Sequence, residues 1–256
     1  MIVSFSNGCF KMVKALVKLF YPRMEIKGRE NLPGEPCIIV GNHSQMHGPI
    51  ACELFMGEDV FTWCTGEMMQ LGEVPAYAYR DFWSEKPGYI RWFYKILSYI
   101  IAPLSVCVFN NARTIPVYRD ARLRTTFRET MDRLDEGSSV VIFPEHDIPC
   151  DNILYDFQDR FIDLAKLYYK KSGKELCFVP MYIAPGLKSI YLGRPVQFSA
   201  ASDMKAERQR ICSYLMDGIR DMARALPEHT VVPYKNVAKK LYPKNTEVPE
   251  NEKACC

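Results

Sequence analysis

Asn42 and His43 directly follow an apolar run, Cys37 to Val40, and a single glycine. A short run of this kind that ends in a polar turn predicts a buried β-strand followed by a loop. In open α/β sheets ligands bind at the carboxyl ends of the strands, so a histidine held there is well placed to act as a base. We therefore interpret His43 as a candidate catalytic base.

Two other interpretations of this histidine stay open on the sequence alone. A histidine at a strand end often serves as a structural hydrogen-bonding group, and His43 and His47 have the spacing of two metal ligands on one helical turn. The sequence offers no third ligand at zinc-site spacing. We therefore expect no metal.

Three further segments have the same design, in which an apolar strand runs into polar residues. They are Ala112 to Arg119, Val140 to Glu145, and Phe178 to Ile183. Such segments, separated by predicted helices, are typical of an α/β fold with a mostly parallel sheet flanked by helices.

These four segments, in this order and beginning with Asn-His, resemble the glycerolipid acyltransferase family. The family includes the 1-acyl-glycerol-3-phosphate and other lysophospholipid acyltransferases, and the resemblance covers roughly Glu25 to Phe198. It implies an α/β domain that transfers an acyl group without a cofactor, using acyl-coenzyme A or acyl-carrier protein as co-substrate.

The resemblance also implies roles for individual residues. His43 matches the family's catalytic histidine, which takes a proton from the acceptor hydroxyl, and Arg119 matches an arginine that contacts the acceptor phosphate. Glu145 would bind the acceptor hydroxyl or orient a histidine. The complete set of candidates is His43 and Glu145 as catalytic residues, and Asn42, Arg119, Phe143, Pro144 and His146 as substrate-binding residues.

The sequence departs from the family pattern at two places. Gly48 stands where the first block has an aspartate, and His146 to Pro149 stand where the third block continues Gly-Thr-Arg-Ser. The family aspartate bonds the far ring nitrogen of the histidine; in a protease triad, losing that contact costs about 10⁴ in rate, an upper guide here. We hypothesise that another group replaces it. The candidates are Glu53, Glu145, Asp147, His47 and His146.

Composition and charge bear on the partners of the protein and on its redox compartment. The chain has 256 residues, 48% of them hydrophobic, and a formal net charge of +3, so its total charge does not indicate a nucleic-acid partner. Its 10 cysteines include no Cys-x-x-Cys pair and several stand singly in apolar runs. Reduced thiols in a cytosolic setting are the better interpretation.

Hydropathy patterning divides the chain into segments. Residues 1–22 predict an amphipathic helix with Lys11, Lys14 and Lys18 on one side, which fits either a membrane interface or packing on the domain. Residues 23–232 form the predicted acyltransferase-like domain and residues 233–256 a C-terminal tail, disordered from Lys244 onward.

Residues 70–110 form an aromatic and apolar insertion within the predicted domain. We expect an interfacial hairpin, since the apolar part is broken by Pro103 and too short for a membrane span of about 20 residues. Packing of these aromatic side chains into the core is the alternative.

The sequence thus predicts acyl transfer from a thioester to the hydroxyl of a lysophospholipid or glycerol phosphate-type acceptor, at the cytoplasmic face of a membrane. Three alternatives stay open: the same chemistry on a different acceptor lipid, a non-catalytic lipid-binding protein of this fold, and a hydrolase. The hydrolase is disfavoured because the chain contains no Gly-x-Ser-x-Gly motif.

Overall fold

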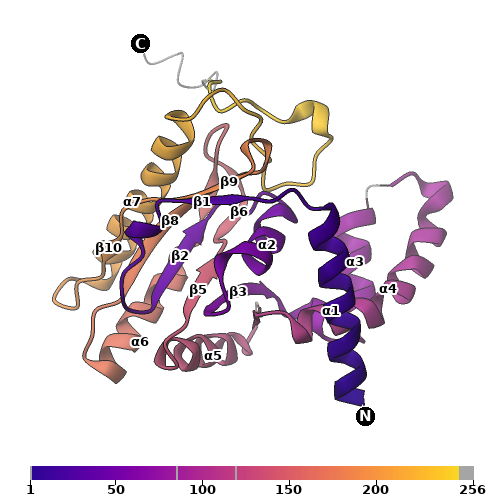
Figure 1. Cartoon of the computed structure of the whole chain (residues 1–256), viewed down its shortest axis with the longest axis horizontal. Coiled ribbons are helices and arrows are strands. Elements are labelled where there is room, and N and C mark those ends of the chain that lie inside the picture. Colours follow the sequence, from indigo (N-terminus) through magenta and orange to yellow (C-terminus); the bar gives the residue numbers. More distant parts are fainter. Residues whose placement is uncertain (1, 85, 119, 248–256) are drawn as a thin grey trace. The chain divides into compact units, whose positions relative to one another are not determined.

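A computed structural model describes residues 2–84, 86–118 and 120–247 (Figure 1). The chain forms two compact units. Unit 1 comprises residues 1–22 and 61–130, and unit 2 comprises residues 23–60 and 131–256.

A mixed, mostly parallel sheet forms the centre of unit 2. The strands are β1 (Glu25–Lys27), β2 (Cys37–Gly41), β5 (Ser139–Ile142), β8 (Cys177–Ala184), β9 (Ser189–Leu192) and β10 (Val196–Gln197). Their order is β1-β9-β8-β2-β5, with β10 beside β8. β2 runs parallel to β8 and β5, whereas β9 and β10 run antiparallel to β8. The predicted α/β fold class is confirmed.

The apolar run Cys37 to Val40 forms most of β2, the strand between β8 and β5. All five residues of β2 are buried, because β8 and β5 cover its two edges and other elements cover its two faces. A strand buried on both faces needs a continuous apolar sequence rather than an alternating one. The same argument explains why Val140, Val141 and Ile142 of β5 are buried.

Two longer helices flank the sheet of unit 2. α6 spans Asp163–Ser172 and ends at Gly173, which has a left-handed φ of 72°. α7 spans Met204–Arg224 and packs along β8 (Figure 1). The carboxylate of Asp203 caps α7 by accepting the backbone N–H groups of Lys205 and Ala206.

Short elements complete unit 2. α2 (His47–Ala51) leads into one π-helical turn, η2 (Cys52–Met56), and 3₁₀ turns span Arg29–Asn31, Asp159–Ile162, Pro185–Leu187 and Lys239–Leu241. A separate antiparallel pair joins β6 (Glu145–Pro149) to β7 (Tyr155–Phe157). No sequence pattern indicated this pair of strands.

Unit 1 is largely helical. Its elements are α1 (Ile2–Phe20), β3 (Val60–Thr65), η3 (Gly66–Met69), α3 (Val74–Ala78), η4 (Tyr79–Trp83), η5 (Gly88–Ile90), α4 (Arg91–Asn111), β4 (Thr114–Val117) and the first part of α5 (Leu123–Asp135). Val60 and the end of α5, from Met131 onward, belong to unit 2. β3 and β4 pair in parallel, and α1 contacts α4. Met68, Val74, Ala78 and Ala102 form its buried core. The predicted N-terminal helix is therefore present.

α4 differs from the predicted broken hairpin. It is one helix of 21 residues that continues through Pro103, and residues 88–111 are long and apolar enough to cross a membrane. The prediction that Pro103 divides this segment was wrong. Proline deprives the carbonyl four residues earlier of its donor, and that carbonyl belongs to Tyr99, a residue that is 70% exposed. The lost hydrogen bond is therefore not a buried defect.

Candidate active site

His43 follows the carboxyl end of β2, as its place after the apolar run predicts. Its backbone N–H donates a hydrogen bond of 2.6 Å to Oε1 of Glu145. Glu145 begins β6, which directly follows β5, the parallel neighbour of β2. Two adjacent strands thus bring together residues 102 positions apart in the sequence.

Both oxygens of the Glu145 carboxylate accept hydrogen bonds from backbone N–H groups. Its second oxygen accepts the N–H of Tyr155 at 2.9 Å, so one side chain joins the His43 loop to β7. Glu145 is only 5% exposed. Burial raises the pKa of Glu145 to about 7, and the two backbone donors oppose that rise. Glu145 thus holds the main chain of His43 rather than its ring, and its binding of an acceptor hydroxyl stays a prediction.

The imidazole ring of His43 lies between aromatic side chains. Its centroid is 5.2 Å from that of Phe143 and 5.7 Å from that of Tyr234, both edge to face. Its Nδ1 is buried and has no hydrogen-bond partner among the described residues. Burial lowers the pKa of His43 to about 4, so the ring is neutral at physiological pH.

The hypothesis that another group replaces the family aspartate is therefore wrong for the described chain. Asp147 is exposed and pairs weakly with Lys235 at 4.0 Å. His146 pairs through Nε2 with Asp156 at 3.3 Å. Glu145 bonds two backbone N–H groups instead of the ring.

Gly48, where the family pattern has aspartate, lies in a position without room for a side chain. A Cβ atom there would overlap the carbonyl oxygen of His43 and come within 3.0 Å of the Phe143 ring. The backbone N–H of Gly48 also donates to that carbonyl at 3.2 Å. The loop is therefore folded around the glycine.

The turn between His43 and α2 has an unusual backbone. Ser44 and Gln45 both have left-handed φ angles, 47° and 54°, which cost energy in residues other than glycine. Asn42 holds the strand end before this turn. Its Oδ1 accepts the N–H of Ile183 at 2.7 Å, and its Nδ2 donates to the Ile183 carbonyl at 3.1 Å and to Ser44 Oγ at 2.7 Å.

The other predicted substrate-binding residues differ in their placement. Phe143 flanks the imidazole, and Pro144 is buried beside Glu145. His146 is partly exposed on β6. Arg119 lies outside the described residues.

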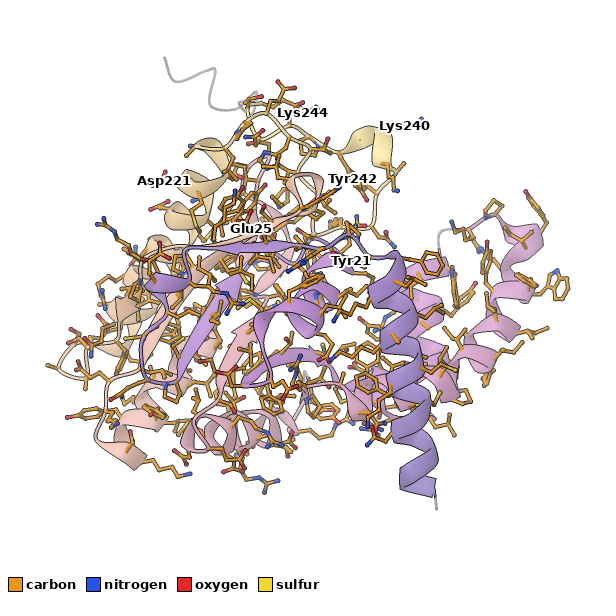
Figure 2. The ribbon with its side chains drawn as sticks, in the orientation of Figure 1. Tyr21, Glu25, Asp221, Lys240, Tyr242 and Lys244 are labelled. Carbon is orange, nitrogen blue, oxygen red and sulfur yellow. The ribbon has the colours of Figure 1, made fainter. Side chains whose placement is uncertain are left out.

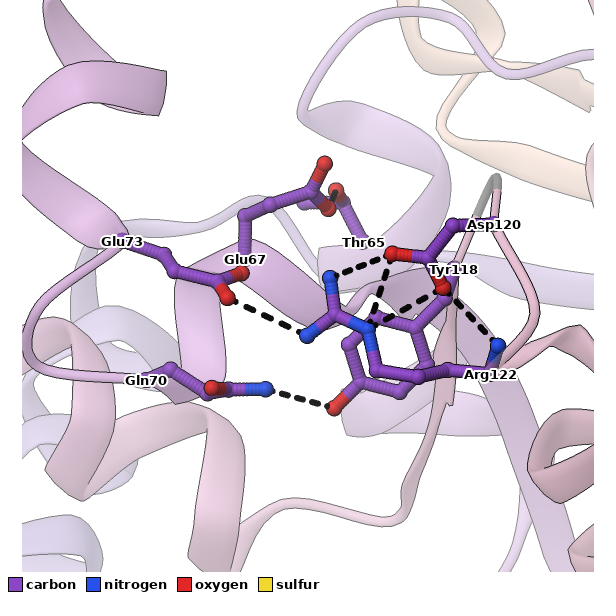
Figure 3. A network of polar contacts seen from close by, with 7 residues as sticks. All are labelled: Thr65, Glu67, Gln70, Glu73, Tyr118, Asp120 and Arg122. Atoms are coloured by element: carbon purple, nitrogen blue, oxygen red, sulfur yellow. Dashed lines mark hydrogen bonds and ion pairs between the residues drawn. The ribbon is translucent and has the colours of Figure 1, made fainter.

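Arg122 is the arginine described nearest in sequence to Arg119. Its guanidinium lies 4.1 Å from the centroid of the Tyr118 ring and pairs with Asp120 at 2.8 Å and Glu73 at 3.1 Å (Figure 3). The guanidinium of Arg122 already contacts two carboxylates and an aromatic ring. Arg122 thus has a structural role within unit 1.

The C-terminal segment contributes to the site, although no sequence pattern indicated it. Tyr234 packs against His43, Lys235 offers its carbonyl to Gln45 Nε2 at 2.9 Å, and the hydroxyl of Tyr242 donates to Gln45 Oε1 at 3.0 Å (Figure 2 labels Tyr242). Residues 234–242 therefore contact the His43 loop, which the sequence did not predict. The expected disorder from Lys244 onward is wrong for Asn245, which is buried and accepts the backbone N–H of His229 at 2.8 Å. The one feature of the sequence that marks this segment is the pair Tyr234 and Tyr242 among several lysines.

The described chain holds no group of three His, Cys, Asp or Glu side chains that could bind a metal ion. His47, the second histidine of the metal interpretation, has a pKa lowered by burial and by the nearby charge of Lys239. The arrangement suits a reaction that needs a neutral base at a strand end.

Comparisons with known proteins give a distant likeness of fold. No family model and no curated protein sequence matches the chain. Its fold resembles the crystal structure of the 1-acyl-sn-glycerophosphate (LPA) acyltransferase PlsC from Thermotoga maritima, with a TM-score of 0.47 and 16% identity over 89% of this chain and 82% of that chain. This likeness concerns the course of the chain alone.

Proposed function

We propose that the protein transfers an acyl group from a thioester to the hydroxyl of a lysophospholipid or glycerol phosphate-type acceptor. The observation that carries the proposal is His43, a neutral imidazole at the carboxyl end of a buried strand. Its main chain is fixed by Glu145 on the element that follows the neighbouring strand. The order of the four sequence segments adds the acyltransferase chemistry to this geometry.

In this reaction the neutral ring of His43 takes the proton of the acceptor hydroxyl. The oxygen attacks the thioester carbonyl, the tetrahedral intermediate collapses, and the departing thiolate takes the proton back from the imidazolium. The intermediate's negative oxygen needs donors, which backbone N–H groups at the strand ends would supply. The balanced reaction requires no cofactor.

The unpartnered Nδ1 sets the efficiency of this mechanism. An aspartate on that nitrogen would fix the tautomer and stabilise the imidazolium, and here the pKa of about 4 describes a poorly stabilised imidazolium. By analogy with a protease triad, the missing partner costs up to about 10⁴ in rate. We therefore propose a slow enzyme.

The same observation favours a second candidate, a non-catalytic lipid-binding protein of this fold. Thiol release from acyl-coenzyme A, measured with and without a panel of lysolipids including non-phosphate acceptors, separates the two. The enzyme should show acceptor-dependent release that His43→Ala abolishes. Absence of release in the wild type, with lysolipid binding intact in both proteins, would contradict the enzymatic proposal and favour the second.

Arg119 is proposed to hold the acceptor phosphate. A guanidinium suits a phosphate because it donates two parallel hydrogen bonds. Replacing Arg119 by glutamine should raise the KM of a phosphate-bearing acceptor and leave that of a neutral lysolipid unchanged. Equal effects on both acceptors would contradict this role.

We also propose that the protein works at a membrane surface, on its cytoplasmic face. The pattern of α4 supports this: the side towards the core carries Ser98, Ala102 and Ser105, whereas the exposed side is apolar. The large exposed side chains are Trp92, Phe93, Ile96, Tyr99, Ile100 and Leu104. An apolar face of this extent calls for an apolar covering, and its aromatic residues suit the membrane boundary.

α1 carries a second exposed apolar stripe at helical spacing, made of Met12, Leu16, Leu19 and Phe20. Lys11 and Lys18 are exposed on the same helix and suit anionic headgroups. The described cysteines are free thiols, which fits a reducing compartment.

Flotation with vesicles of phosphatidylcholine and phosphatidylglycerol tests the membrane proposal. The double variant Ile96→Glu/Ile100→Glu places charge on residues that are 52% and 67% exposed and should lose flotation without loss of fold. Leu167→Glu on α6, where the leucine is 42% exposed, is the matched control and should float like the wild type. Unchanged flotation of the double variant would contradict the proposed surface.

A further inference from the structure

A concave site in unit 2 lies apart from the His43 ring. It is a cavity of about 690 Å³, a volume within the range of small-molecule sites. Its walls come from the start of β1, the end of η2 and the loop between β8 and β9. They include Arg23, Arg29 and Lys188, and the apolar residues Leu54, Phe55 and Leu187.

The cavity has an excess of uncompensated positive charge. Arg23, Arg29 and Lys188 are exposed and form no ion pair within the part of the chain that the structure describes. Glu25, labelled in Figure 2, also lines the cavity but pairs with Lys27 at 3.7 Å. Three cations around one concave site suit a ligand that carries several negative charges.

Local contacts hold the guanidinium of Arg29 and the backbone of Lys188. Arg29 Nη2 donates to the Phe55 carbonyl at 3.4 Å, so its guanidinium is tied to the end of η2. Lys188 has a left-handed φ of 51°, and its carbonyl accepts the N–H of Glu25 at 2.9 Å. A non-glycine residue held in this conformation is a mark of functional sites.

The sheet register places the cavity at the same edge as His43. β1 and β9 begin where β8 ends, since Glu25 pairs with Ser189 and Ser189 pairs with Ala184. β2 runs parallel to β8 and ends at that edge too. Three strand spacings separate β2 from β1, which corresponds to about 15 Å along the edge.

We propose that this cavity, here called the cationic cavity, binds the phosphate groups of coenzyme A as acyl donor. The inference rests on the proposed acyl transfer and names its donor. In coenzyme A a long pantetheine arm separates the phosphates from the thioester, so a phosphate site some distance from His43 suits the donor. In a lysophosphatidic acid only the glycerol separates the phosphate from the hydroxyl, so its phosphate must lie close to His43.

The charge of the cavity distinguishes coenzyme A from an acyl-carrier protein. Coenzyme A carries a diphosphate and a 3′-phosphate, whereas the arm of a carrier protein has one phosphodiester. Three cations match the charge of coenzyme A better than that of the carrier-protein arm. The apolar side chains of Leu54, Phe55 and Leu187 can contact the adenine ring or the pantetheine arm.

Calorimetric titration of the full-length protein with coenzyme A, pantetheine and oleoyl-lysophosphatidic acid tests the proposal. Arg29→Gln and Lys188→Gln should each weaken coenzyme A binding about tenfold, the value of one hydrogen bond to a charged group. Arg194→Gln is the matched control, because Arg194 is exposed in unit 2 and does not line the cavity. Glu25→Gln should tighten binding, a gain that misfolding cannot produce.

Several results would overturn the proposal. Equal affinity for coenzyme A and pantetheine would show that the phosphates are not recognised. Cavity variants that bind coenzyme A like Arg194→Gln would show that these cations are not used. Loss of lysophosphatidic acid binding instead, or transfer from acyl-carrier protein without coenzyme A binding, would assign another ligand.

Failure of the inference can be told apart from failure of the proposed function. If coenzyme A binds through these cations but no acyl transfer occurs with any acceptor, the cavity assignment stands and the reaction is wrong. If transfer from acyl-coenzyme A occurs and the cavity variants leave its KM unchanged, the reaction stands and the cavity assignment is wrong.

Discussion

The ionisation of Glu145 and that of His43 change the free energy of unfolding with pH in opposite directions. The substitution Glu145→Gln removes the first contribution and so separates the two. The carboxylate of Glu145 is buried and accepts the backbone N–H groups of His43 and Tyr155. Glutamine has the same shape and no charge, but its NH₂ group cannot accept a hydrogen bond. One of the two backbone N–H groups therefore loses its acceptor, which costs about 1–3 kcal/mol at any pH.

The pH dependence comes from the ionisation of Glu145. Burial raises its pKa from 4.5 to about 7, so between these values the folded protein binds a proton that the unfolded chain has released. The free energy of unfolding must then fall as pH rises through this window. Linkage gives a fall of about 2.5 kcal/mol between pH 5 and pH 8.

His43 has the opposite effect, so the wild type alone is not informative. Burial lowers the pKa of His43 from 6.5 to about 4, and the unfolded chain therefore binds the extra proton. This contribution to the free energy of unfolding rises by about 2 kcal/mol from pH 5 to pH 8. The two effects nearly cancel in the wild type. Glu145→Gln should therefore gain about 2.5 kcal/mol relative to wild type between pH 5 and pH 8.

Urea unfolding followed by far-ultraviolet circular dichroism is the suitable assay. The three tryptophans, Trp63, Trp83 and Trp92, all belong to unit 1, so tryptophan fluorescence would not report on the site. Glu30→Gln, at an exposed glutamate of unit 2, is the control and should follow the wild type. A Glu145→Gln profile parallel to that of the wild type would refute the reasoning.

Two further substitutions test how the His43 loop is built. Gly48→Ala should destabilise unit 2 by about 1–3 kcal/mol in urea unfolding, since its Cβ would overlap the carbonyl of His43, and Gly48→Asp should not raise activity. Gly34→Ala is the control, because nothing lies within 4 Å of its Cβ, and a cost for Gly48→Ala as small as that of the control would contradict the tight fit. Asn42→Ala leaves the N–H and C=O of Ile183 without their side-chain partner and should cost about 2–4 kcal/mol, whereas a cost below 1 kcal/mol would mean that other groups replace the amide.

The central strands and the long helices could be predicted from sequence because burial leaves a local pattern there. A strand with both faces covered must be continuously apolar, as Cys37 to Val40 is. α7 is capped by Asp203 and buries residues at helical spacing, such as Ile211, Leu215 and Ile219. In both cases the residues that cause the structure are adjacent in the sequence.

The rest depends on contacts between distant residues. The ring of Tyr234 contacts that of His43, although the two residues lie far apart in the sequence of unit 2. No local pattern marks such a contact. The left-handed turn at Ser44 and Gln45 lacks the glycine or asparagine that usually signals one. β6 was missed because Glu145 to Pro149 is mostly exposed and does not alternate.

The measurement that tests the central claim most directly is the titration of His43 by nuclear magnetic resonance. The chain has four histidines, so the signal of a ¹³C-labelled imidazole can be assigned by its loss in His43→Gln. The buried, unpartnered ring of His43 is expected to stay neutral down to its pKa of about 4 and to take up a proton only below that pH. A pKa at or above 6.5 would show that the ring has a carboxylate partner or is open to water, and would contradict the account of a neutral, unpartnered base.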